Sequence, residues 1–190
     1  MKRPIIIKSF SGLLNLLICL TGAFLGSCLT GPTKETILIP DYFEGEFRIA
    51  YGEKCGLNPK IENGRRILEI PENGLLIIQP QFEAGIIDHQ YYFFDSDFNR
   101  ARINQILDYK GRITKMPGVL VGGSGVMDGL IPDGGLSSES PAAINFTDFI
   151  VFNKDTTTVP EFELYKASQR FDSITTALVK KCRQTGSNRQ

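Results

Sequence analysis

Residues 65–78, RRILEIPENGLLII, decide how this chain folds. Polar and apolar residues alternate over residues 66–70, which is typical of a β-strand with one buried face. Residues 71–74, PENG, are a turn signal, because Asn-Gly readily takes the positive φ angles of a tight hairpin. The apolar run 75–78 indicates a second strand, covered on both faces. The stretch therefore predicts two strands joined by a tight hairpin turn.

Segments of the same kind lie on both sides of this stretch. They alternate or are rich in aromatic residues, and they comprise residues 46–51 (EFRIAY), 90–95 (QYYFFD) and 144–152 (INFTDFIVF). Turn signals recur at short spacing without intervening helices, which favours an antiparallel sandwich or barrel over a βαβ array. We therefore expect a mainly β fold, an antiparallel β-sandwich, over residues 36–158.

The C-terminal segment has a different period. Six residues follow helical spacing and share one apolar face: Leu164, Ala167, Phe171, Ile174, Leu178 and Cys182. Pro160 is well placed to open a helix, and Gly186 ends the pattern. We expect one helix over residues 159–184 that packs on the sheet, with partner binding as the alternative use of its face. Residues 185–190 are expected to be a frayed tail.

Composition limits the classes of function. The chain has 190 residues, with 21 Lys plus Arg, 21 Asp plus Glu and one His. Zero net charge argues against a nucleic-acid binder that works by neutralising phosphates. A single His removes catalytic and metal-binding schemes that need two. We expect no metal and no other cofactor.

Residues 1–27 have the order of parts of a secretory signal. Basic residues near the start are followed by an uncharged, largely apolar run and then by small residues. Residues 25–28, LGSC, resemble a bacterial lipobox. The resemblance implies cleavage before Cys28, a diacylglycerol on its thiol and further acyl chains such as palmitate, with residues 28–35 as a tether. An uncleaved membrane anchor and ordinary secretion are the alternatives.

Short motifs in the body resemble those of a known group of proteins. In chain order they are Ile39-Pro40, Gly45, Ile49-Ala50-Tyr51, Gly64-Arg65-Arg66, IPENG at residues 70–74, Tyr91-Tyr92 with Asp95, and GGSG at residues 122–125. This pattern is similar to that of a family of small uncharacterised bacterial lipoproteins that share a domain of unknown function. The resemblance implies a lipidated protein of the cell envelope and supplies no catalytic residue. We expect an outer-membrane location, facing the periplasm or the cell surface.

The cysteines divide by position. Cleavage before Cys28 would remove Cys19 with the signal, and Cys28 would carry the lipid. Cys55 and Cys182 would then be the two cysteines of the folded body. Two cysteines in an exported protein are often bonded, because the compartment is oxidising. We expect a disulfide between them, with two separate thiols as the alternative.

A glycine-rich stretch over residues 121–141 carries the strongest candidate for a binding loop. Gly122, Gly123, Ser124 and Gly125 fit neither a P-loop, which needs a following Lys, nor a nucleophile elbow, which needs G-x-S-x-G. So many glycines predict a loop without a fixed shape of its own. The apolar residues within it, Leu130, Ile131 and Leu136, are expected to contact a partner or ligand, and a tolerated insertion is the alternative.

Two further motifs bear on the chemistry of the chain. Residues 95–99, DSDFN, start like a calcium loop, but Arg100 and Ile106 stand where Gly and Glu are needed, so a turn is expected. Ser124 has one possible His partner, His89. We expect a lipid-anchored, non-enzymatic binding or scaffolding module whose partner is an envelope protein or glycan. The alternative is an envelope hydrolase that uses Ser124 or a carboxylate.

Overall fold

The computed structural model describes residues 32–83, 85, 87–106, 117–152 and 161–187, with helix side chains from Phe171 to Gly186. The predicted signal and residues 28–31 of the expected tether, including Cys28, lie outside these residues, while residues 33–35 of that tether belong to the first strand, with Glu35 fully buried. The strands are β1 (Thr33–Pro40), β2 (Gly45–Tyr51), β3 (Lys60–Glu62), β4 (Arg65–Glu69), β5 (Leu75–Ile77), β6 (Ile87–Phe94), β7 (Arg100–Ile106), β8 (Gly118–Met127) and β9 (Ile144–Phe152). The helix α2 spans Glu161–Ser187.

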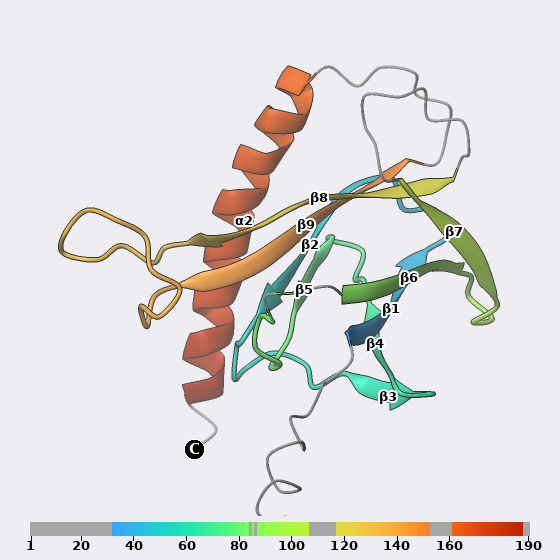
Figure 1. Cartoon of the computed structure of the whole chain (residues 1–190), viewed down its shortest axis with the longest axis horizontal. Helices are drawn as coiled ribbons and strands as arrows, with labels where there is room; N and C mark the ends of the chain where they lie inside the picture. The colour runs from blue at the N-terminus through green and yellow to red at the C-terminus, as the bar shows by residue number, and fades with distance from the viewer. Residues whose placement is uncertain (1–31, 84, 86, 107–116, 153–160, 188–190) are drawn as a thin grey trace, which may run out of the picture. The chain divides into compact units, whose positions relative to one another are not determined.

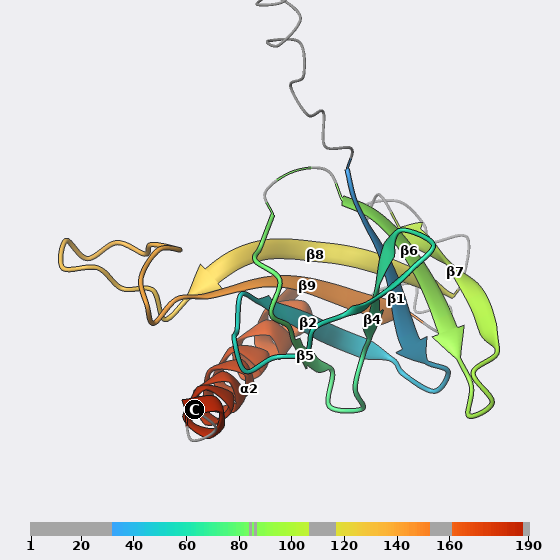
Figure 2. The same cartoon turned by 90° about the horizontal axis from the view of Figure 1, so that it is seen from below.

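The described strands form one curled, mixed sheet in the order β3-β4-β1-β6-β7-β8-β9-β2-β5 (Figures 1 and 2). The predicted mainly β fold with one C-terminal helix is confirmed. The curled sheet is intermediate in form between a sandwich and a half-barrel. The pairs β3–β4, β6–β7, β8–β9 and β2–β9 are antiparallel as expected. The pairs β1–β4, β1–β6, β2–β5 and β7–β8 are parallel, which the sequence pattern did not indicate.

The prediction of a hairpin at residues 65–78 is wrong, although the predicted turn is present. Gly74 has a φ of 74°, and the Asn73 side chain accepts a hydrogen bond from the Leu75 amide at 3.1 Å. The flanking strands β4 and β5 then separate and lie near opposite ends of the sheet. Each strand finds a parallel partner elsewhere, β4 on β1 and β5 on β2.

The concave face of the sheet holds the main core, because alternate residues of each strand point inward. Phe47 and Phe149, which face each other on β2 and β9, stack with ring centroids 4.7 Å apart. The buried inner residues are Ile37, Ile39, Phe43, Phe47, Ile49, Tyr51, Leu68, Ile70, Leu76, Ile78, Tyr91, Phe93, Ile103, Val119, Phe149 and Val151.

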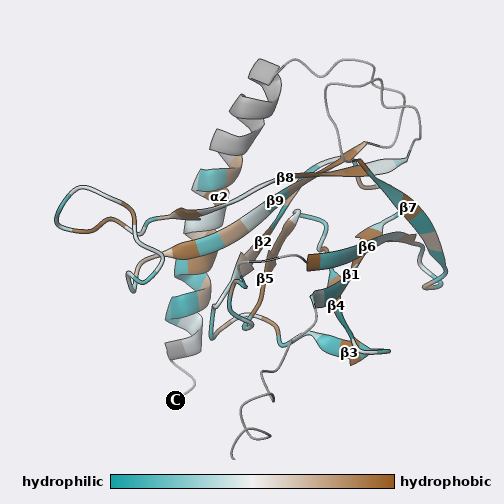
Figure 3. Cartoon of the chain, in the orientation of Figure 1, coloured by the Kyte–Doolittle hydropathy of each residue, from teal (hydrophilic) through white to brown (hydrophobic). Residues whose placement is uncertain are grey.

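The helix α2 packs on the outer face of the sheet as expected, but its buried face is shifted from the predicted one, since Thr175 and Val179 are fully buried and Ile174 is 37% exposed. Val179 is fully buried against Ala50 of β2, Leu75 of β5 and Ile144 of β9. Figure 3 shows hydrophobic and hydrophilic residues alternating along β9 and around the described part of α2. The helix continues to Ser187, beyond the expected end at residue 184, and Gly186 lies directly over the Cys55 β-carbon.

The expected loop over residues 121–141 begins later than predicted. Gly122, Gly123, Ser124 and Gly125 belong to strand β8, which pairs with β9 and has an irregularity between Val121 and Gly123. A β-carbon at Gly125 would lie 3.0 Å from the Phe146 ring. At Gly125 glycine makes room for a neighbouring aromatic ring, whereas a β-carbon at Gly123 would meet no atom within 4 Å.

Candidate functional site

One end of the sheet interior is polar. Glu35 of β1 is fully buried, and its Oε2 lies 3.1 Å from His89 Nε2 of β6. Arg66 of β4 reaches the other Glu35 oxygen at 3.6 Å and binds Glu83 at 2.5 Å. The sequence indicated none of these contacts, because they depend on the parallel pairing of β1 with β4 and β6.

Two tyrosine hydroxyl groups, those of Tyr51 and Tyr91, point into the same interior. Both are buried and have no hydrogen-bond partner among the described residues. Burial, reinforced by the negative charge of Glu35, raises the pKa of each phenol well above its ordinary value. Both hydroxyl groups therefore stay neutral near physiological pH.

The residues of the hydrolase alternative do not form a direct pair. Ser124 Oγ lies 2.8 Å from Thr147 Oγ1 on the neighbouring strand β9. His89 instead contacts the Glu35 carboxylate, and among the described side chains no hydrogen bond joins Ser124 to His89. A serine nucleophile activated by histidine requires that hydrogen bond.

The turn expected at residues 95–99 is confirmed. Asp95 Oδ1 accepts hydrogen bonds from the backbone amides of Asp97 and Asn99 at 2.9 and 2.8 Å, and its Oδ2 accepts one from Asn99 Nδ2 at 2.9 Å. These bonds, those from Asn99 first, lower the pKa of Asp95. Within the described ranges, no three His, Cys, Asp or Glu side chains gather as a metal site.

A buried ion cluster that sequence reasoning missed joins the outer face of the sheet to α2. Arg48 of β2 is fully buried, and it binds Asp148 of β9 through two bonds of 2.5 and 2.9 Å. It also donates to Asp172 of α2 at 2.7 Å, and its guanidinium lies 4.0 Å from the centroid of the Phe146 ring. No local pattern indicated this cluster, because the sequence does not show which residues of the sheet α2 covers.

The carboxylates around Arg48 are more numerous than its single charge can neutralise. Burial, followed by repulsion from Asp148, raises the pKa of Glu46 to about 7. Burial also raises the pKa of Asp148, although its bonds to Arg48 oppose the change. Glu46 and Asp148 are therefore protonated more readily than ordinary carboxylates.

The C-terminal half of α2 is fastened by covalent and ionic contacts. The structure contains the disulfide expected between Cys55 and Cys182, with their Cα atoms 5.6 Å apart. Next to it, Arg183 binds both oxygens of the buried Glu53 at 2.6 and 2.8 Å. The helix is thus tied to the sheet through Asp172 and again, ten residues later, through Cys182.

The loop between β8 and β9 contains a small ordered hairpin, which we call the apolar hairpin (residues 129–137). Leu130 and Leu136 form a bridge, and backbone hydrogen bonds of 2.8 to 3.0 Å close the turn. The expectation that this segment lacks a fixed shape is therefore wrong. The side chains predicted to contact a partner are on its surface, with Leu130 72%, Leu136 55% and Ile131 37% exposed.

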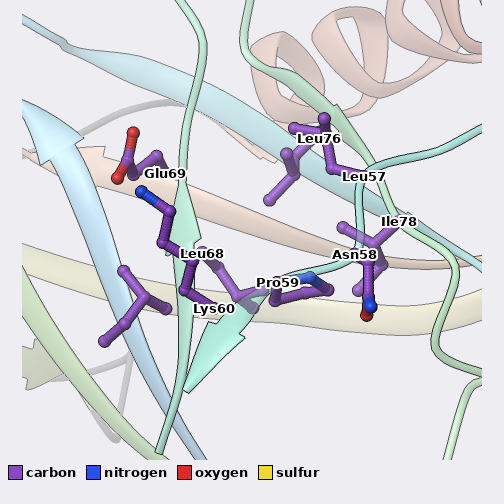
Figure 4. A pocket seen from close by; sticks show the side chains of 9 residues that line it. Leu57, Asn58, Pro59, Lys60, Leu68, Glu69, Leu76 and Ile78 are labelled. Atoms are coloured by element: carbon purple, nitrogen blue, oxygen red, sulfur yellow. The ribbon is translucent and has the colours of Figure 1, made fainter. Parts of the chain in front are cut away.

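A pocket, which we call the edge pocket, lies where the two ends of the curled sheet approach each other (Figure 4). One wall comes from β3 and β4, and the other comes from β5 and the segment that precedes β3. Its volume is about 180 Å³. The lining residues are Leu57, Asn58, Pro59, Lys60, Ile67, Leu68, Glu69, Leu76 and Ile78. No sequence pattern indicates this pocket, because its walls are distant strands.

These features define a class of protein: a curled mixed sheet with a disulfide-fastened C-terminal helix, a small edge pocket and a projecting apolar hairpin. The chain belongs to a family of unknown function, DUF6843, whose pattern matches residues 31–159. The fold is similar to the crystal structure of a Bacillus anthracis protein named "Putative Lipoprotein", with 14% sequence identity and a TM-score of 0.57. The similarity covers 80% of this chain and 96% of that one. No curated protein matches the sequence.

Proposed function

We propose that this chain is a lipid-anchored protein of the bacterial cell envelope that acts as a non-enzymatic binding module. The lipobox-like residues 25–28 support the anchor, as does the name of the structural neighbour. Residues 29–32 separate Cys28 from β1 and span at most about 14 Å, so the anchor would hold the folded body close to the bilayer. Within the described residues, no helix is long and apolar enough to cross a membrane.

The apolar hairpin carries the binding part of the proposal. Its backbone hydrogen bonds fix its shape, while Leu130 and Leu136 keep more than half of their surface exposed. Several adjacent exposed aliphatic side chains are typical of a contact surface. They suit a protein partner in the envelope better than a glycan, whose surface consists largely of hydroxyl groups.

The lipid anchor predicts that Cys28→Ser abolishes acylation. Growth with an alkyne-labelled fatty acid should mark the wild-type protein and leave the variant unmarked, because the thiol that receives diacylglycerol is gone. The variant should also leave the membrane fraction or keep its unprocessed N-terminus. Cys19→Ser serves as the matched control and should label as the wild type does. Equal labelling of wild type and Cys28→Ser would refute the anchor.

The binding role predicts that a Leu130→Ser, Leu136→Ser double variant loses its envelope partner. Recovery of that partner after chemical cross-linking and pull-down should fall at least about tenfold, since the two exposed side chains provide the apolar contact. Stability should change little, because both side chains face solvent. Phe98→Ser is the control, as Phe98 is 69% exposed on a different turn. Unchanged recovery from the double variant would contradict the proposal.

A further inference from the structure

We propose that a groove between α2 and β5 binds a single-chain amphiphile with an anionic head, the chemistry of a fatty acid. The groove, which we call the helix groove, is lined by residues within 54–57, 73–79 and 178–186. This small-molecule site goes beyond the binding function proposed above. It shares no residue with the apolar hairpin and does not depend on the lipid anchor.

The walls of the helix groove are fixed before any ligand binds. The disulfide between Cys55 and Cys182 joins the segment that precedes β3 to α2, the two sides of the groove. Gln79 Nε2 donates to the backbone carbonyl groups of Lys54 and Gly56, at 3.3 and 3.1 Å, and so holds this segment beside β5. A ligand therefore does not have to order either wall, which would lower its affinity.

The floor of the helix groove is apolar. Leu75 is 4% exposed, and Ile77 of β5 and Leu178 of α2 are partly buried beside it. Leu57 also lines the groove and is 65% exposed, so an alkyl chain that covers it removes apolar surface from water. The volume of the groove, about 710 Å³, lies within the roughly 300–1,000 Å³ of sites for small molecules.

The charged residues that line the helix groove have one sign. Lys54 and Lys181 stand on its two sides, both are exposed, and no Asp or Glu is among the lining residues. Within the described ranges, no ion pair joins either lysine to a carboxylate. The adjacent Glu53 carboxylate is already bound through both oxygens by Arg183. Two such ammonium groups favour an anionic head over a neutral or cationic one.

The positions of the lysines indicate how the ligand lies. Lys54 and Lys181 each directly precede a cysteine of the disulfide, so both charges flank that bond. Leu178 lies about one helical turn before Lys181 and packs with Leu75 in the apolar cluster under α2. The anionic head therefore belongs beside the disulfide, and the alkyl chain runs from there toward Leu75.

Photochemical cross-linking tests the site on the full chain in phosphatidylcholine nanodiscs. The probe is dodecanoate with a diazirine near the end of its chain, which on irradiation loses N₂ and inserts into a neighbouring bond. We expect adducts on peptides from the groove that saturate with probe concentration and are suppressed by unmodified dodecanoate. The alcohol of the same length should give at least about tenfold fewer groove adducts, because it lacks the charge. Adducts on the phospholipid measure how much of each probe is available.

Matched variants separate the two parts of the groove. The double variant Lys54→Ala, Lys181→Ala should lose at least about tenfold of the groove adducts, whereas Lys54→Arg, Lys181→Arg should keep them, because the positive charges remain. Lys180→Ala is the control, as Lys180 is exposed on α2 but does not line the groove. Leu57→Ser should also reduce the adducts, and Ile61→Ser, at a residue 64% exposed on β3, should not.

Three results would overturn the proposal. The first is the absence of saturable adducts on the groove peptides. The second is equal labelling by the alcohol probe, or equal loss in Lys180→Ala and the double alanine variant, since the lysines of the groove would then not select an anion. The third is displacement of the probe by inorganic phosphate as effectively as by dodecanoate, which would indicate a site for the anionic head alone.

Discussion

Cys182→Ser is expected to lower the free energy of unfolding by about 4 kcal/mol under oxidising conditions. The disulfide joins residues 127 positions apart, so it removes much of the freedom of the unfolded chain. For loops of this length the loop-entropy relation gives roughly 5 kcal/mol, and real disulfides often provide somewhat less. Urea unfolding of the mature chain, followed by circular dichroism, measures this difference. The comparison requires that the free energy of unfolding falls with urea concentration at the same slope in both proteins.

Two controls test whether the stabilisation comes from the disulfide itself: replacing the other cysteine, and reducing the bond. Cys55→Ser should have the same effect as Cys182→Ser, and the double variant should be no less stable than either single one, because the bond is lost only once. Dithiothreitol should destabilise the wild type by a similar amount and leave the variants unchanged. A wild type whose unfolding midpoint does not move on reduction would show that the bond contributes nothing to stability.

Much of the fold could be predicted from local signals. Alternation and aromatic content located the strands β2, β6 and β9, and helical spacing located α2. The disulfide was predicted from two cysteines in the exported body, and the turn at Asp95 from the ability of its side chain to accept backbone hydrogen bonds. In each case the decisive interaction lies within a few residues or depends on residue type alone.

The rest depends on contacts that no local pattern encodes. The turn at Gly74 has the positive φ predicted, yet the strands on either side pair with β1 and β2, because the full sheet offers them longer partners than each other. A β-carbon at the exposed Gly125 would contact the Phe146 ring, a constraint visible only after β8 and β9 are placed together. The edge pocket is missed for the same reason, since its walls come from both ends of the sheet.

The stability contribution of Arg48 also depends on long-range contacts. Its side chain is fully buried between Asp148 of β9 and Asp172 of α2. We expect Arg48→Met to lower the free energy of unfolding by about 3–5 kcal/mol, because it leaves the Asp148 carboxylate buried without a counter-ion. Arg48→Lys should recover little of this loss, since an ammonium cannot bind Asp148 through two parallel bonds. Urea unfolding of the three proteins at about pH 8.5, above the pKa of about 7 that burial gives Glu46, measures the series.

The two aspartates provide the matched comparison for Arg48. The Asp148 side chain is 16% exposed and that of Asp172 is 49% exposed, although both contact the same guanidinium. Asp172→Asn should therefore cost less than about 1 kcal/mol, as for a pair largely in solvent. Adding Asp148→Asn to Arg48→Met should restore part of the lost stability, because the uncompensated buried charge is then removed. If the double variant is less stable than Arg48→Met alone, the loss arises from packing around Phe146 rather than from an unpaired carboxylate.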